Sequence, residues 1–231
     1  MLVTIHQPDF LPWLGLFNKI NKADHFIILD HVLNNPKAAD FYCRRVKMLI
    51  GGKEHWMSVT LKKDPDNLFI PINTMELQMD DTSTKKFLQS VDLNYRKAPF
   101  FSEVFSLVND YFYLPTNNLS KKNCWFIIEV MKKLNINTTI TYSSDLNPQF
   151  TSNEMLIDLL QKSIATTYLC GSGAMSYQND DLYLKNNIKV EYNNFVHPIY
   201  NQFNSKQFLK GLSIIDALMN LGFEETSKLI K

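Results

Sequence analysis

The chain has 231 residues, of which 45% are hydrophobic and 20% charged, and its formal net charge is +1. This composition excludes a disordered chain, and a chain of this length buries roughly 70% of its unfolded surface without disulfides or metals. The near-neutral charge excludes a global field that recruits nucleic acid or anionic lipid, so an anionic partner must be bound by a local cluster.

The three cysteines, Cys43, Cys124 and Cys170, are widely spaced, which favours reduced, buried thiols over disulfides or a zinc site. The first residues lack the basic and apolar regions of a signal peptide, and no stretch approaches the ~20 apolar residues of a membrane helix. We therefore expect a cytoplasmic protein that does not insert into a membrane.

The N-terminal part of the chain predicts a βαβ unit. An apolar run from Leu2 to Ile5 indicates a buried strand that ends at His6, and Pro12 suits the first turn of a helix that extends to Ala23. A second buried strand follows over residues 25–30. The two strands should be parallel neighbours in one sheet.

The middle of the chain predicts a hairpin and then helices. Alternating apolar residues on both sides of Gly51-Gly52 indicate a β-hairpin over residues 42–61. Helical spacing dominates after Thr82 and predicts three helices, with Pro99 and Pro115 as breakers.

The last third returns to α/β alternation. We predict strands over 138–142, 167–170 and 188–192, a helix over 152–164, and a final helix that runs from Ser213 to Gly222. The predicted fold is therefore one α/β domain spanning residues 1–231, with a mostly parallel sheet, a β-hairpin and a helical insertion near 83–135.

The segment His6-Gln7-Pro8-Asp9 is the first candidate for a site, because ligands bind beyond the carboxyl ends of strands in open α/β sheets. His6 suits a general base, and Gln7 and Asp9 add a neutral hydrogen-bonding group and an anion. The alternative interpretation is a hydrogen-bonded histidine beside an ordinary turn.

Asp30 ends the second predicted strand, so its carboxylate is expected within reach of the His6 loop, where it would orient His6, hold a metal or bind a hydroxyl. A turn cap is the alternative. Asp9, Asp30 and Asp216 are all potential Mg²⁺ ligands, but no spacing in the sequence fixes a metal site, and no cofactor motif identifies a cofactor.

Arg44, Arg45 and Lys47 form the densest basic cluster, which suits the phosphates of a nucleotide-linked substrate, with a solvated strand face as the alternative. The loop Gly171-Ser172-Gly173 follows a predicted strand, and its small residues allow backbone N–H groups to approach an anion. Neither a Walker A motif, nor a Gly-x-Gly-x-x-Gly fingerprint, nor a Gly-x-Ser-x-Gly elbow is present.

These segments together resemble the WbqC-like family of bacterial surface-polysaccharide biosynthesis. The resemblance begins with residues 5–17 and extends in order through 19–20, 23–24, 29–30, 45–47, 52–56, 95–101, 143–144, 168–171, 177, 197–202 and 212–216. It departs between Asn34 and Arg44, where the family usually has a polar, Asn- and Arg-rich stretch and this chain has the segment 36–41.

The resemblance implies a role in building O-antigen or related surface glycans. We expect a transferase whose partners are a nucleotide-linked amino sugar and an acyl or aminoacyl donor. The candidate catalytic residues are His6, Asp9 and Asp30. The candidate substrate-binding residues are Gln7, Trp13, Arg44, Arg45, Lys47, Gly171, Ser172, Tyr177, His197, Tyr200 and Gln202.

Two other functions fit the same residues. The strand–loop–helix opening also resembles nucleotidyltransferases with a His-x-Gly-His signature, but the comparable segment Trp13-Leu14-Gly15-Leu16 lacks both histidines. An ATP-dependent adenylating ligase with displaced groups is the enzymatic alternative. A non-catalytic protein that binds a glycan intermediate or a partner enzyme is the other.

Overall fold

The computed structural model describes residues 1–64, 69–176 and 178–231. The strands of the described chain are β1 Leu2–His6, β2 His25–Ile28, β3 Leu33–Asn34, β4 Arg45–Ile50, β5 Lys53–Ser58, β6 Ile70–Pro71, β7 Thr139–Tyr142, β8 Thr167–Gly171 and β9 Lys189–Asn193. The helices are α1 Leu14–Lys22, α2 Asp81–Tyr95, α3 Phe101–Tyr113, α4 Leu119–Lys133, α5 Ser152–Lys162, α6 Asp180–Lys185 and α7 Ile214–Leu229.

Five parallel strands form the central sheet in the order β7-β2-β1-β8-β9. The first two strands pair directly, with Val3 opposite His25 and His6 opposite Ile28. This confirms the predicted α/β class and the parallel pairing within the βαβ unit. Two antiparallel pairs, β4-β5 and β3-β6, lie outside the central sheet.

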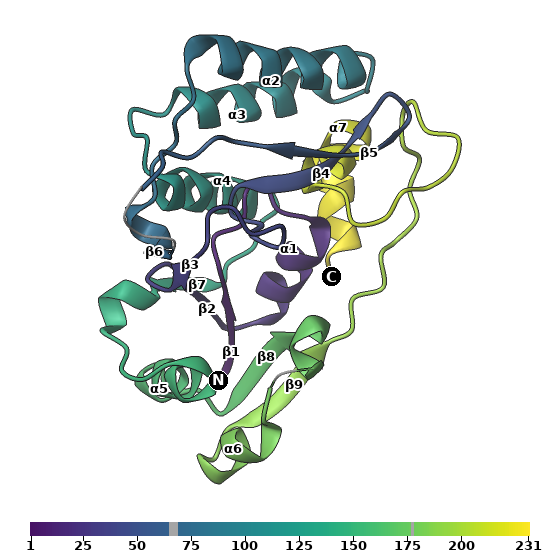
Figure 1. Ribbon diagram of the computed structural model, residues 1–231. Helices are drawn as coiled ribbons and strands as arrows, with labels where there is room; N and C mark the ends of the chain where they lie inside the picture. Colours follow the sequence, from purple (N-terminus) through teal and green to yellow (C-terminus); the bar gives the residue numbers. More distant parts are fainter. Residues whose placement is uncertain (65–68, 177) are drawn as a thin grey trace.

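The central sheet is covered on both faces, and the alternating side chains of β2 lie in two different cores. Phe26 and Ile28 contribute to a large core with side chains of α1, α4 and α7, whereas Ile27 points to a smaller core with side chains of α5 and α6. This alternation follows from the two-residue period of a strand. Figure 1 shows α5 and α6 in the lower part of the molecule, away from α2, α3 and α4 in the upper part.

The chain between β2 and β7 leaves the central sheet and returns to its neighbouring strand. It forms the β4-β5 hairpin, which turns at Gly51 and Gly52 with φ of 60° and 76°, and then helices α2, α3 and α4. The predicted hairpin and the three predicted helices are confirmed. Asp80 and Asn118 cap two of these helices by accepting hydrogen bonds from backbone N–H groups.

The predicted end of the last helix at Gly222 is wrong. Gly222 has φ 75° and ψ 175°, which interrupts α7, but the helix resumes and ends at Leu229. A Cβ at this position would lie 2.8 Å from the ring of Phe100, the N-cap residue of α3, so the missing side chain of Gly222 makes room for this ring. Helix α6 was not predicted, because its six residues show too short an apolar pattern.

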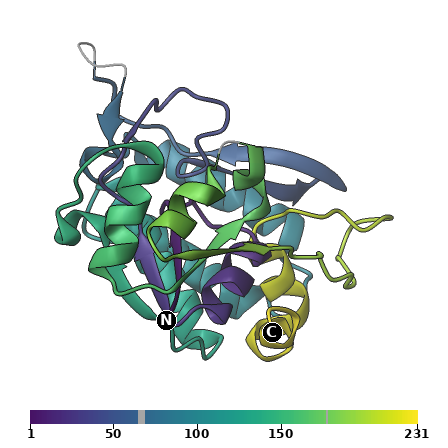
Figure 2. The same ribbon diagram turned by 90° about the horizontal axis from the view of Figure 1, so that it is seen from below.

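A long connection over residues 194–213 runs from β9 to α7. In both views it lies on the side of the molecule opposite α5 (Figures 1 and 2). No helix among the described residues has the length and apolar character needed to cross a membrane.

Candidate functional site

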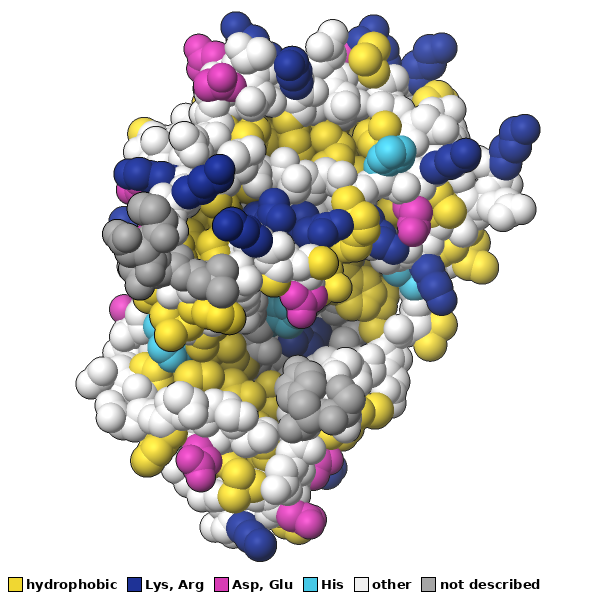
Figure 3. All heavy atoms as spheres, in the orientation of Figure 1, with side chains coloured by type: hydrophobic (Ala, Val, Ile, Leu, Met, Phe, Trp, Pro, Cys, Tyr) yellow, Lys and Arg dark blue, Asp and Glu magenta, His cyan; other side chains and the backbone are white. Residues whose placement is uncertain are grey.

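A cavity of about 780 Å³ opens at the carboxyl ends of β1, β8 and β9. Helix α1, which follows β1, packs into the larger core, whereas α6, which follows β8, packs into the smaller core on the other face. The strand order therefore reverses between β1 and β8, and ligands of open α/β sheets bind at such a reversal. Figure 3 shows this face hollowed, with Lys and Arg side chains gathered along the upper edge.

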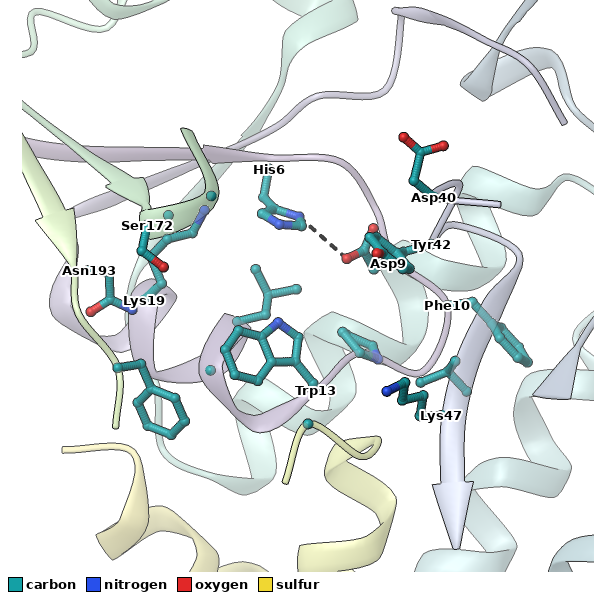
Figure 4. A pocket seen from close by; sticks show the side chains of 18 of the residues that line it. His6, Asp9, Phe10, Trp13, Lys19, Asp40, Tyr42, Lys47, Ser172 and Asn193 are labelled. Carbon is teal, nitrogen blue, oxygen red and sulfur yellow. Dashed lines mark ion pairs between the residues drawn. The ribbon is translucent and has the colours of Figure 1, made fainter. Parts of the chain in front are cut away.

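His6 ends β1 and borders the cavity, with 31% of its side chain exposed. Its Nδ1 atom lies 2.9 Å from the carbonyl oxygen of Gln7 and 3.7 Å from Oδ2 of Asp9. With Nδ1 carrying the proton and donating to the carbonyl, Nε2 is left as a proton acceptor. The predicted juxtaposition of His6 and Asp9 is therefore present in the structure, as Figure 4 shows.

The cavity also contains a buried lysine that the sequence did not single out. Lys19, on the second turn of α1, is 4% exposed, lines the cavity, and donates a hydrogen bond from Nζ to the carbonyl oxygen of Ile5 at 3.2 Å. Figure 4 places His6 between Lys19 and Asp9. Three titratable side chains from one βα segment thus face the same cavity.

Burial shifts the pKa of each of these groups towards its neutral form. Desolvation, aided by the charge of Lys19, lowers the pKa of His6 to about 3. Desolvation raises the pKa of Asp9 to about 7 against the opposing effect of Lys19, and it lowers the pKa of Lys19 to about 8 against the opposing effect of Asp9. Such perturbed groups in a cavity are characteristic of functional sites.

The loop that carries His6 and Asp9 is fixed from behind by α4. Asn123 is fully buried and donates from Nδ2 to the carbonyl oxygens of Pro8, at 2.8 Å, and Cys43, at 2.7 Å. Its Oδ1 accepts a hydrogen bond from Tyr111 at 2.9 Å. Because these bonds hold backbone rather than side chains, they set the position of the whole loop.

The side chain of Gln7 contacts Cys43, whose backbone carbonyl is also held by Asn123. Its Oε1 lies 3.7 Å from Sγ of Cys43 and 3.5 Å from Nδ2 of Asn34, and Cys43 also contacts Asp9 at 3.8 Å. Gln7 is not among the residues that line the cavity in the described chain. The contacts of Gln7 with Cys43 and Asn34 are those of a residue that stabilises the loop.

Trp13 stands in the middle of the cavity, with 37% of the residue exposed (Figure 4). Its six-membered ring lies against the backbone of Gly15, where a Cβ would meet ring atoms at 2.2 to 2.5 Å. Its ring also contacts Phe195 edge to face at a centroid distance of 5.6 Å. Gly15 is therefore needed for the position of Trp13, not for a special backbone conformation.

Two of the three predicted basic residues, Arg45 and Lys47, line the cavity from alternate positions of β4. The guanidinium of Arg45 lies 4.0 Å above the ring of Trp56, and Trp56 stacks on Tyr42 with ring centroids 5.9 Å apart. Lys47 forms an ion pair with Glu54 at 3.1 Å. The edge of the cavity thus combines two cations with exposed aromatic rings.

Arg44 does not join them. It lines a second cavity of about 460 Å³, with Lys37, Lys62 and Lys63 among the other lining residues. Adjacent residues of an extended chain point to opposite sides, so the hairpin separates Arg44 from Arg45 and Lys47. The predicted cluster of three is divided between two surfaces.

Gly171 and Ser172 line the cavity at the end of β8, the parallel neighbour of β1. Asn193, at the end of β9, adds a side chain whose Oδ1 accepts a hydrogen bond from Lys22 at 3.0 Å. Tyr177, the remaining candidate from this part of the sequence, lies outside the described residues.

Asp30 is not brought into the cavity, as far as the described residues show. Strand β2 ends at Ile28, and the carboxylate of Asp30 accepts hydrogen bonds from Oγ of Ser143 at 2.9 Å, from the backbone N–H of Ser144 at 3.0 Å and from Oγ of Ser144 at 2.8 Å. These bonds join the end of β2 to the turn after β7. The geometry is that of the turn cap that the sequence left as an alternative.

His197, Tyr200 and Gln202 belong to the connection before α7 and are absent from the described lining of the cavity. Tyr200 and Gln202 donate to Oδ2 of the buried Asp216 at 2.8 and 3.0 Å, and Tyr95 donates to its Oδ1 at 3.0 Å. Burial raises the pKa of Asp216, and these hydrogen bonds oppose the rise. The network attaches the connection to α7.

His197 lies among aromatic rings behind the cavity. Its ring is 6.4 Å from that of Trp13 and 5.3 Å from that of Phe208, between ring centroids. Burial lowers the pKa of His197. The observed contacts support Trp13 from outside the cavity.

No group of three or more His, Cys, Asp or Glu side chains in the described parts of the chain is arranged to hold a metal ion. Asp9, Asp30 and Asp216 lie in the three separate environments described above.

Comparison with known proteins covers nearly the whole chain. The model described as "WbqC-like protein family" matches residues 7–228. A curated relative, "Uncharacterized protein Rv1507c" of Mycobacterium tuberculosis, is 28% identical over 229 residues, which span 96% of this chain and 94% of the relative. No solved structure matches the chain.

Proposed function

Because this chain belongs to the WbqC-like protein family, we propose that it is an enzyme of surface-polysaccharide biosynthesis that transfers an acyl or aminoacyl group to the amine of a nucleotide-linked amino sugar. The surface-polysaccharide context comes from the family resemblance. The choice of chemistry is supported by the cavity.

The observation that carries this proposal is the combination of His6 with Asp9 and Lys19 inside one cavity, at the reversal of strand order. The contact of Nδ1 with the carbonyl oxygen of Gln7 leaves Nε2 of His6 as the proton acceptor. Arg45 and Lys47 supply cations for a diphosphate at the edge, and Tyr42 and Trp56 supply rings beside them.

The proposed step is nucleophilic acyl transfer. The sugar amine attacks the carbonyl carbon of an activated ester or thioester donor, a C–N bond forms, and the bond to the leaving group breaks. His6 takes the proton that the amine loses and returns it to the leaving oxygen or sulfur. Asp9, 3.7 Å from Nδ1, stabilises the imidazolium that forms between the two transfers.

The proposal is tested by incubating the full chain with a panel of nucleotide-linked amino sugars and acyl or aminoacyl donors, with and without ATP, followed by mass spectrometry. The expected product is the nucleotide sugar with its amine acylated. Pyrophosphate release that depends on ATP and an amino acid would instead identify an adenylating ligase. Binding of the nucleotide sugar without any product would identify a non-catalytic binding protein.

A further inference from the structure

Lys19 is a buried lysine that forms no ion pair with a carboxylate in the part of the chain that the structure describes. It is 4% exposed, and no described Asp, Glu or C-terminal oxygen lies within 4.0 Å of its Nζ atom. Its hydrogen bond goes to a neutral acceptor, the carbonyl oxygen of Ile5. A lysine has three N–H donors, so this bond leaves two of them for other acceptors.

The surroundings compensate the charge of Lys19 only in part. Asp9 is the carboxylate that acts on Lys19 most strongly, but burial holds the pKa of Asp9 near 7, so it is only partly ionised at neutral pH. Lys22, one turn further along α1, instead donates to Asn193. Burying a cation without a counter-charge is costly, and proteins usually pair such a charge.

The position of Lys19 explains where a partner for this charge would come from. Lys19, Gly171 and Gly173 all line the open cavity, and among the described residues, apart from the chain neighbours of each glycine, no atom lies within 4 Å of a Cβ built at Gly171 or Gly173. In Figure 4, Lys19 and Lys47 lie on opposite sides of the cavity, with His6 and Trp13 between them. A ligand that spans the cavity therefore meets a cation at each end.

We propose that Lys19 is a binding residue for an anionic oxygen, from a carboxylate or a phosphate of the ligand, at the end of the cavity away from Arg45 and Lys47. This assignment rests on the proposed function only in placing the ligand in this cavity. It adds to that function that the substrate or the donor carries a second anionic group, separate from the diphosphate at the edge.

The experiment measures the thermal unfolding midpoint of the full chain in increasing sodium acetate and, separately, sodium phosphate, with ionic strength held constant by chloride. The two salts distinguish a carboxylate site from a phosphate site. In the wild type we expect at least one of them to raise the midpoint by about 3 °C or more at roughly tenfold excess over its dissociation constant. Lys19→Met should abolish this rise.

The matched control is Lys189→Met, which removes the same charge from an exposed ion pair with Glu191 on β9. This variant should keep the full rise. A rise that survives in Lys19→Met, or the absence of any rise in the wild type with both salts, overturns the proposal. If Lys19→Met does not fold, a crystal of the wild type soaked in the same salt provides the test: the anion lies within hydrogen-bonding distance of Nζ of Lys19, or the proposal is wrong.

The unfolding midpoint reports anion binding and not catalysis, so the anion site and the proposed function can fail separately. If the anion binds at Lys19 but no acylated sugar forms in any reaction, the proposed function fails and the anion site stands. If product forms equally well in the wild type and in Lys19→Met, and neither salt binds, the transferase stands and the anion site fails.

Discussion

Nδ1 of His6 lies 3.7 Å from Oδ2 of Asp9, yet burial drives the two side chains towards their neutral forms instead of an ion pair. The pKa of His6 falls to about 3 and that of Asp9 rises to about 7. Asp9 is therefore mostly ionised above pH 7 and mostly neutral below it, so stability should depend on pH in a way that can be measured.

Asp9→Asn should change how stability depends on pH. Because the pKa of Asp9 rises from 3.8 to about 7 on folding, the stability that its protonated carboxyl provides is complete below about pH 4 and is lost as the pH rises through about 7. The asparagine variant stays neutral, so its unfolding midpoint should exceed that of the wild type above pH 7, with a difference that shrinks towards pH 4. His6, Lys19 and Cys43 face this position in both proteins. An equal difference at every pH would contradict the raised pKa.

His6→Ala should lower kcat of the proposed transfer by about 10²-fold or more, a usual effect of losing a general base. In the wild type, His6 is already deprotonated above about pH 3, so kcat/KM should show no histidine limb near pH 6.5. Steady-state rates between pH 5 and 9 measure both effects. Equal turnover in mutant and wild type would exclude His6 as the base.

Arg45→Met and Arg44→Met should separate the two surfaces of the hairpin. Arg45 lines the cavity and Arg44 lines the second one, so only the Arg45 variant should weaken nucleotide-sugar binding, by about tenfold or more for the loss of a charge-assisted contact. Isothermal titration with the same nucleotide sugar compares them. A larger loss in the Arg44 variant would place the diphosphate in the second cavity.

Gly15→Ala should destabilise the protein by about 1–3 kcal/mol. The new Cβ would lie 2.2 Å from the nearest ring atom of Trp13, so the indole must move. The matched control is Gly173→Ala, where no atom of the described residues beyond its chain neighbours lies within 4 Å of the new Cβ, and its change should stay within about 0.5 kcal/mol. Denaturant unfolding gives both values. Equal effects at the two positions would show that Trp13 moves aside freely.

Asn123→Ala should destabilise by about 2–4 kcal/mol, since it leaves the buried carbonyls of Pro8 and Cys43 and the hydroxyl of Tyr111 without this partner. Asn94→Ala removes hydrogen bonds to Ser90 and Gly51 at a more exposed position and should cost less. Unfolding in urea compares the two. A smaller loss for Asn123→Ala would mean that Asn123 does not hold the His6 loop.

The sequence predicted the elements well where apolar periodicity was long. The βαβ opening, the hairpin and the three middle helices all follow from it. The same reasoning placed His6 and Asp9 at the end of a strand, and there the structure brings them together with Gly171 and Ser172.

The candidate site residues that were placed wrongly or missed from the sequence have separate physical causes. Arg44 and Arg45 were grouped by proximity in sequence, although the two-residue period of the predicted strand already separates neighbouring side chains. Lys19 lies on the amphipathic helix α1, where the sequence favours a lysine whose charged end reaches solvent, and only the fold shows that its Nζ atom donates to the carbonyl oxygen of Ile5 in β1. The roles of Asp30, Tyr200 and Gln202 depend on partners more than ten residues away, such as Ser143 and Asp216.

The position of β1 in the sheet has a consequence for how the protein is made. Thr4 donates a hydrogen bond to the carbonyl oxygen of Leu169, 165 residues further along, because β1 lies between β2 and β8. A ribosome that releases the chain from its N-terminus exposes one edge of β1 until β8 has been synthesised. Non-local pairing of this kind folds slowly. His6 thus leaves the ribosome before β8 and β9, and its cavity is complete only after these strands have been synthesised.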